Sequence, residues 1–110
     1  MQAYLEDSDP ITADSRGFDY VGANPIMVMQ VLDAVVPGSV EEFIRSELFG
    51  KLGITDYSWR NYDDGLRVAD TGSSLTSHDT LKIGNMVADN GRWDGTQVLP
   101  QEFVLSLIHI

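Results

Sequence analysis

The stretch NPIMVMQVLDAVVPG, residues 24–38, decides how the rest of this sequence is interpreted. Asn24 can cap the free amide groups of a helix, and Pro25 suits the first helical position, where its missing N–H costs nothing. The run from residue 26 to residue 36 is apolar on nearly every side, which is typical of a helix that is buried all round. Pro37-Gly38 ends it. We therefore predict a helix over residues 25–36 at the centre of a larger domain.

A second helix is predicted directly after the first. SVEE, residues 39–42, is a capping box in which Ser39 caps the helix and the Glu42 side chain reaches back to it. The helix extends over residues 39–49 and ends at Gly50 or Gly53. We expect it to pack against the first helix through apolar side chains that face the interior: Phe43, Ile44, Leu48 and Phe49.

Irregular segments flank these two helices. Residues 1–19 are polar and punctuated by Pro10 and Gly17, which predicts a loop. Residues 54–75 are rich in turns and lack clear periodicity, so we expect a long excursion around the turn at Asp63-Asp64-Gly65. A loop of that length in a compact domain more often has a function, such as binding or catalysis, than none.

The last third of the chain is predicted to contain one helix and one further helical turn. TSHD, residues 76–79, resembles a capping box, and Asn90-Gly91 closes the helix that it starts. Asp94-Gly95 makes a tight turn, and Pro100 begins the last helical turn, through Val104. Apolar residues of the helix after residue 79 are expected inside: Leu81, Ile83, Met86 and Val87.

Composition and charge exclude several classes of function. The 110 residues suffice for one domain, and the formal charge of −10 argues against nucleic acid and anionic membranes as partners. The absence of cysteine excludes disulfides, a Cys-ligated zinc site and a thiol nucleophile. No apolar run approaches the length of a membrane span, and the acidic N-terminus has no signal-peptide core. These features leave the compartment open, and we expect no cofactor.

The histidines do not indicate a catalytic or metal site. Ser77-His78-Asp79 contains the three residue types of a catalytic triad, but adjacent side chains project in different directions, whereas a triad needs them to converge. A helix start is the better interpretation of this tripeptide. His109 stands without a partner near the end of the sequence, and the distance between the two histidines makes a metal site improbable.

Tyr20 is the strongest candidate for a catalytic residue. It lies at a loop-to-helix junction, and the small residues Gly22 and Ala23 that follow would let a substrate approach the backbone. One interpretation is a tyrosine packed on the core with its hydroxyl bonded. The other is a general base, which needs fixed positive charge nearby because a phenol has an ordinary pKa of about 10. The sequence contexts of Lys51 and Lys82, at a helix end and on a helix surface, do not provide that charge.

Three stretches in order resemble one family. They are RGFDY, residues 16–20, followed by an apolar helix; SVEEFIRSELFGKLGITD, residues 39–56; and residues 71–95, which run from TGSSLTSHD through GNM to NGRWDG. Together they are similar to the β-lactamase-related serine hydrolases. That family includes class C β-lactamases, D-alanyl-D-alanine carboxypeptidases, esterases of that fold and 6-aminohexanoate-oligomer hydrolases.

The resemblance implies a role for Tyr20. In the family a serine in a Ser-x-x-Lys motif is the nucleophile, and its lysine shares the proton work with the tyrosine of a Tyr-x-Asn motif. Tyr20 maps onto that tyrosine, as the general base that takes the serine proton and returns one to the leaving group. Gly22 stands where the motif has Asn, and Asn24 follows two residues later; both are candidate substrate-binding residues. The departure at Gly22 favours the esterase and amidase branch.

Two family motifs are missing from the sequence. There is no Ser-x-x-Lys, and no Lys-Thr-Gly or His-x-Gly follows residue 95. The tail LSLIHI, residues 105–110, also looks like translated sequencing-adapter read-through. We therefore expect residues 1–110 to be a single partial domain, an internal and mostly α-helical fragment of an α/β (α+β) fold of the β-lactamase/transpeptidase type.

The expected function is that of a piece of a serine hydrolase. The parent enzyme would cleave a small-molecule ester or amide through an acyl-enzyme, with serine and lysine supplied by an upstream segment. The alternative is a non-catalytic helical binding module, or an inactive family relative that acts as a sensor.

Overall fold

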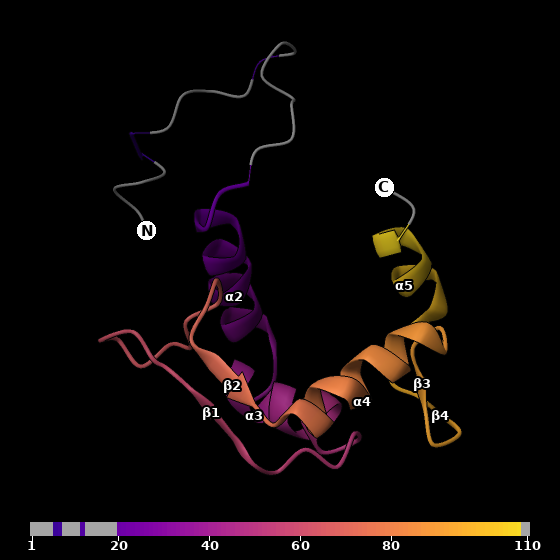
Figure 1. The fold of residues 1–110 in the computed structure, drawn as a ribbon. Coiled ribbons are helices and arrows are strands. Elements are labelled where there is room, and N and C mark those ends of the chain that lie inside the picture. The colour runs from indigo at the N-terminus through magenta and orange to yellow at the C-terminus, as the bar shows by residue number, and fades with distance from the viewer. Residues whose placement is uncertain (1–5, 8–11, 13–19, 109–110) are drawn as a thin grey trace.

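A computed structural model describes residues 6–7, 12 and 20–108 of the chain. In Figure 1, α2 and α5 stand at opposite ends of the described chain, with α3 and α4 between them. The helices are α2 (Ala23–Val35), α3 (Val40–Ile44), the π-helix η2 (Arg45–Phe49), α4 (Ser77–Ala88) and α5 (Gln101–Ile108). The strands form two antiparallel hairpins, β1 (Tyr57–Trp59) with β2 (Ser73–Leu75), and β3 (Arg92–Trp93) with β4 (Thr96–Gln97).

Helix α2 confirms the first predicted helix but begins earlier than expected. Gly22 is its N-cap residue, and no side chain caps it, so the prediction that Asn24 is the cap was wrong. The chain turns into the helix before Asn24, whose N–H already donates to the Val21 carbonyl at 3.2 Å. Pro25 is therefore the third helical residue. It still lies within the first turn, where no N–H has a partner inside the helix.

The burial of α2 differs from the prediction of a helix buried all round. Only Met29 is buried along its length. Four apolar residues spaced i, i+3, i+4 and i+7 form one exposed stripe, which we call the α2 stripe: Val28 (58% exposed), Val31 (62%), Leu32 (36%) and Val35 (70%). The helix packs against α3, and no described element covers the stripe.

The second predicted helix is present in two parts, α3 and η2. Ser39 caps α3 by accepting the Glu42 N–H at 3.2 Å, as predicted, whereas the Glu42 carboxylate lies 3.8 Å from Arg45 instead of reaching back to Ser39. The Val40 N–H donates to the Asp33 carboxylate at 2.9 Å, which joins α3 to α2. Of the two predicted ends, Gly50 is confirmed, because η2 ends at Phe49 with Gly50 as its C-cap residue. Gly53, with a φ of 63°, lies in the turn that follows.

The predicted interior face of this segment is partly wrong. Phe49 is buried, but Phe43 is 40% exposed. The register slips because the helix widens into a π-turn at η2, so that the Gly50 N–H donates to the Arg45 carbonyl, five residues back. Ile44 before the π-turn and Leu48 within it still pack against the core cluster that contains Phe49, so the predicted interior face is wrong only at Phe43.

The core lies where η2, α4 and the second hairpin meet. Its buried members are Phe49, Leu52, Ile54 and Met86. The Phe49 and Tyr57 rings pack edge to face, with centroids 4.7 Å apart. Gly91 is needed nearby, because its φ is +84° and a Cβ there would lie 2.3 Å from the Leu99 carbonyl oxygen.

Residues 54–75, predicted as a long excursion, are largely a β-hairpin. Strands β1 and β2 pair at its base, and the Arg60 N–H continues the ladder to the Gly72 carbonyl at 3.0 Å. The Trp59 indole N–H donates to the Val68 carbonyl at 2.7 Å. The strands were not predicted because three residues are too few to show an alternating pattern. The predicted turn at residues 63–65 forms the tip, where Gly65 has a φ of +88°.

The C-terminal elements follow the sequence signals closely. Thr76 caps α4 by accepting the Asp79 N–H at 3.1 Å. Asp94 and Gly95 both have positive φ, 46° and 76°, as a tight two-residue hairpin turn requires. Leu81, predicted inside, is 58% exposed. Helix α5 runs past the predicted last turn to residue 108, and residues 109–110 lie outside the described part of the chain.

The described residues bury few apolar side chains. Eight are buried and nine large ones are exposed. None of the described helices is by itself long and apolar enough to cross a membrane; α2 and the α3–η2 segment reach that length only together, across a bend of 93°.

Met86→Ala should lower the free energy of unfolding by about 2–5 kcal/mol, because it opens a cavity in the core cluster. Met86 is 1% exposed, whereas Leu81 on the same helix is 58% exposed. Leu81→Ala is therefore the matched control, with a loss below about 1 kcal/mol. Urea denaturation followed by circular dichroism measures both. Equal losses would mean that α4 does not present Met86 to a core.

The α2 stripe should make the chain associate at high concentration, because a contiguous apolar stripe favours burial against another surface. Val31→Ser together with Val35→Ser should shift the distribution towards monomer in sedimentation velocity. Leu81→Ser removes one isolated exposed apolar residue and serves as the control. A chain that is monomeric at every concentration would contradict this expectation.

Candidate functional site

The structure places Tyr20 among the residues that line a surface cavity. The residue is 92% exposed and lies two residues before Gly22, the N-cap residue of α2. The cavity has a volume of about 560 Å³ and is lined by Tyr20, Val21, Gly22, Pro25, Ala69 and Asp70. We call it the Tyr20 cavity. Its walls come from the start of α2 and from residues 69–70, which lie between the tip of the long hairpin and β2. The exposure of Tyr20 is inconsistent with the interpretation of a tyrosine packed on the core.

Gly22 lies in this cavity, but the space beside it belongs to a carboxylate. Asp70 Oδ2 lies 3.1 Å from the point where a Cβ on Gly22 would stand. The absence of a side chain at residue 22 therefore lets Asp70 approach the backbone at the start of α2. The sequence had predicted that a substrate would approach the backbone at this point. Asn24 is exposed on the first turn of α2 and is not among the residues that line the cavity.

Asp70 was missed by sequence reasoning. It lies far along the chain from Tyr20, in a segment without periodicity, and the hairpin alone brings it to α2. Its Oδ1 accepts a hydrogen bond from the Tyr62 hydroxyl at 3.4 Å. The nearest sequence signal is Gly72, two residues later, which has a φ of +86° directly before β2.

The Tyr62 phenol is held in its neutral form by this arrangement. Its pKa is raised, and the largest cause is partial removal from water. The negative charge of Asp70 and the hydrogen bond to Asp70 raise it further. Arg60 acts in the opposite direction, and Asp64 adds to the rise. Tyr62 therefore serves as a hydrogen-bond donor that orients the Asp70 carboxylate.

The two lysines are engaged elsewhere in the described structure. Lys51 Nζ lies 2.5 Å from Glu47 on η2. Lys82 Nζ pairs with Asp79 at 2.7 Å and donates to the Gly53 carbonyl at 3.0 Å. This agrees with the prediction that neither lysine supports Tyr20.

Ser77-His78-Asp79 forms a helix start rather than a triad. Asp79 is buried and bonded to Thr76 and Lys82, whereas Ser77 and His78 are exposed. The Lys82 hydrogen bond, followed by that from Thr76, lowers the pKa of Asp79, which is the behaviour of a structural carboxylate. Within the described residues, no three His, Cys, Asp or Glu side chains are grouped to hold a metal ion. His109 lies outside the described residues.

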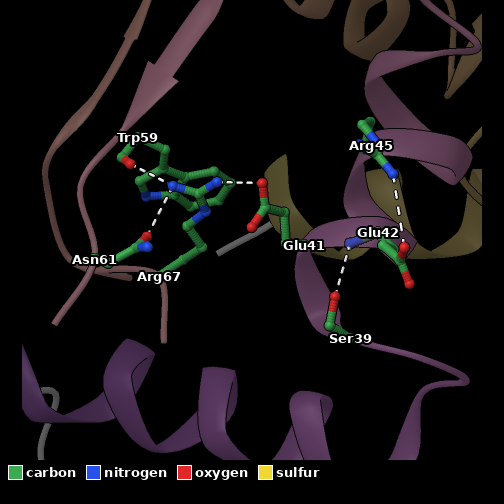
Figure 2. Close-up of polar contacts among 7 residues, drawn as sticks. All are labelled: Ser39, Glu41, Glu42, Arg45, Trp59, Asn61 and Arg67. Carbon is green, nitrogen blue, oxygen red and sulfur yellow. Dashed lines mark hydrogen bonds and ion pairs between the residues drawn. The ribbon is translucent and has the colours of Figure 1, made fainter. Parts of the chain in front are cut away.

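A second cavity, of about 420 Å³, lies between the tip of the long hairpin and helices α2 and α3. Arg67 on its wall donates to the Asn61 side chain at 2.8 Å and to the Trp59 carbonyl, and forms an ion pair with Glu41 of α3 (Figure 2). These contacts occupy both terminal guanidinium nitrogens. The remaining nitrogen, Nε, is buried without a hydrogen-bond partner. Arg67 is therefore a structural tie between the hairpin and α3.

Comparison with known proteins adds no identification: no family model matches the chain, and no curated protein is significantly similar to it. The RGFD residues of the motif before Tyr20, residues 16–19, lie outside the described part of the chain.

Asp70→Asn should lower the pKa of Tyr62 towards its ordinary value, because it removes a nearby negative charge. Burial should keep that pKa from returning to the ordinary value completely. Spectrophotometric titration of tyrosinate measures the shift, with Tyr62→Phe identifying the Tyr62 component. Asp56→Asn, a change in an exposed carboxylate outside the Tyr20 cavity, is the control. An unchanged titration in Asp70→Asn would contradict the contact.

Proposed function

We propose that this chain supplies the tyrosine base of a β-lactamase-related serine hydrolase, acting on an ester or amide through an acyl-enzyme. The serine and lysine come from a segment outside these 110 residues. The observation that carries the proposal is the 92% exposure of Tyr20 on the wall of a cavity, at the position where the sequence resembles the family's tyrosine motif. A hydroxyl presented in this way is accessible to a nucleophile and a substrate.

The chemistry requires two proton transfers at Tyr20. The phenolate takes the serine proton while Oγ attacks the carbonyl carbon, which gives a tetrahedral intermediate. The tyrosine then returns the proton to the leaving alcohol or amine as the ester or amide bond breaks. Water attacks the acyl-serine in the same way, which releases the acid and restores the serine.

A phenolate base needs stabilising positive charge, because its ordinary pKa is about 10. Among the described residues that line the Tyr20 cavity, the charged one is the carboxylate Asp70, and none is cationic. The proposal therefore depends on the lysine of a Ser-x-x-Lys motif standing close to Tyr20.

The 110-residue chain alone should form no acyl-enzyme, because no serine in it belongs to a Ser-x-x-Lys motif. Incubation with a fluorescent penicillin and with an activated ester, followed by intact-protein mass spectrometry, measures this. A stoichiometric adduct at a single site would show that the nucleophile lies within the chain.

In a gene product that also contains a Ser-x-x-Lys motif, Tyr20→Phe should lower the acylation rate by roughly 10²–10⁴-fold, the usual contribution of a positioned base. The melting temperature should hardly change, because the Tyr20 side chain is exposed. Tyr57→Phe removes a hydroxyl from a tyrosine packed on Phe49 and is the matched control. Acylation at the wild-type rate in Tyr20→Phe would remove Tyr20 from the mechanism.

The second candidate is a non-catalytic helical binding module. The α2 stripe favours it, because an uncovered apolar helix face is the usual contact surface of such modules. The two candidates predict different behaviour of the 110-residue chain and its variants. A binding module would retain its partner affinity as the 110-residue chain and lose it in Val31→Ser with Val35→Ser, whereas Tyr20→Phe would have no effect.

A further inference from the structure

The Tyr20 cavity has an unusual balance of chemical groups. Its described lining residues combine a phenol and a carboxylate, Tyr20 and Asp70, with small or apolar residues, and none of these described residues is cationic. Asp70 has no ion-pair partner among the described residues, and its one hydrogen bond, from Tyr62, is long at 3.4 Å. The Oδ2 atom is left facing the start of α2 beside Gly22.

An exposed carboxylate on the wall of a cavity suits one class of ligand. An ammonium group can donate charge-assisted hydrogen bonds to the carboxylate. An anionic group would be repelled by Asp70. The whole chain adds to this preference, because its formal charge of −10 attracts cations towards the surface.

We propose that Asp70 is a specificity-determining residue that selects substrates carrying an ammonium group, and that it binds this group within the Tyr20 cavity. The inference rests on the proposed function, since it assigns the substrate class of the same site. The reacting ester or amide then lies at the Tyr20 end of the cavity, and the ammonium lies at the Gly22 and Asp70 end.

The preference should be modest, because Asp70 is exposed to solvent. Ion pairs at exposed positions typically change an equilibrium by about two- to fivefold. The effect should also decrease with ionic strength, since salt screens exposed charges. These two properties distinguish a surface carboxylate from a buried binding pair.

The test uses two esters of the same shape and different charge. Methyl 3-aminopropanoate carries an ammonium group at neutral pH, and methyl butanoate replaces it with a methyl group. Both are titrated into the isotope-labelled 110-residue chain at low salt, and the amide shifts of Gly22 and Ala69 report binding at the cavity. The cationic ester should bind more tightly. Asp70→Asn should weaken its binding about two- to fivefold and leave methyl butanoate unchanged.

Asp56→Asn is the matched control, because it removes the same charge from an exposed carboxylate that does not line the cavity. It should leave both affinities unchanged. The inference is overturned if the two esters bind equally, if neither shifts Gly22 and Ala69, or if Asp56→Asn weakens the cationic ester as much as Asp70→Asn does.

The same variants separate this inference from the proposed function. In a gene product that contains the Ser-x-x-Lys motif, Tyr20→Phe should slow turnover of both esters equally, and Asp70→Asn should slow only the cationic one. Normal turnover in Tyr20→Phe with selective binding through Asp70 would refute the catalytic role and keep the ammonium site. Slow turnover in Tyr20→Phe, with Asp70→Asn affecting both esters equally or neither, would support Tyr20 as the base and refute the selectivity of Asp70.

Discussion

The guanidinium of Arg67 is the contact on which the position of the candidate site depends. It bonds the Trp59 carbonyl and the Asn61 side chain within the long hairpin, and it forms an ion pair with Glu41 on α3. The Arg67 side chain is only 15% exposed, so removing one partner would leave a largely desolvated charge without compensation. The hairpin is thereby held against the helices, and the segment between Arg67 and β2 places Asp70 beside Gly22 at the start of α2.

The packing is uneven along the chain. Buried apolar side chains gather where η2, α4 and the second hairpin meet, whereas α2 buries one residue. Elements with few buried contacts open at low free-energy cost, so α2 is expected to be among the least stable parts of the fold. The candidate site lies at the start of that helix.

Electrostatics set the chemical character of the site. The described lysines are bound to Glu47 and Asp79, and the described lining of the Tyr20 cavity includes a phenol, Tyr20, and a carboxylate, Asp70, which accepts a hydrogen bond from Tyr62. In the proposed function, a lysine from another segment would activate Tyr20. In the further inference, a cationic group of the substrate would pair with Asp70.

The sequence by itself determined the elements whose signals are local. The caps at Ser39 and Thr76, and the turns at residues 63–65 and 94–95, were predicted because each depends on a few adjacent residues. The sequence also singled out Tyr20, through its motif and its place before a helix. Only the tertiary structure decided that α2 leaves a stripe exposed, that short strands pair across residues 57–75, and that Asp70 fills the space beside Gly22. These features join residues far apart in the chain, and no local pattern encodes which distant groups meet.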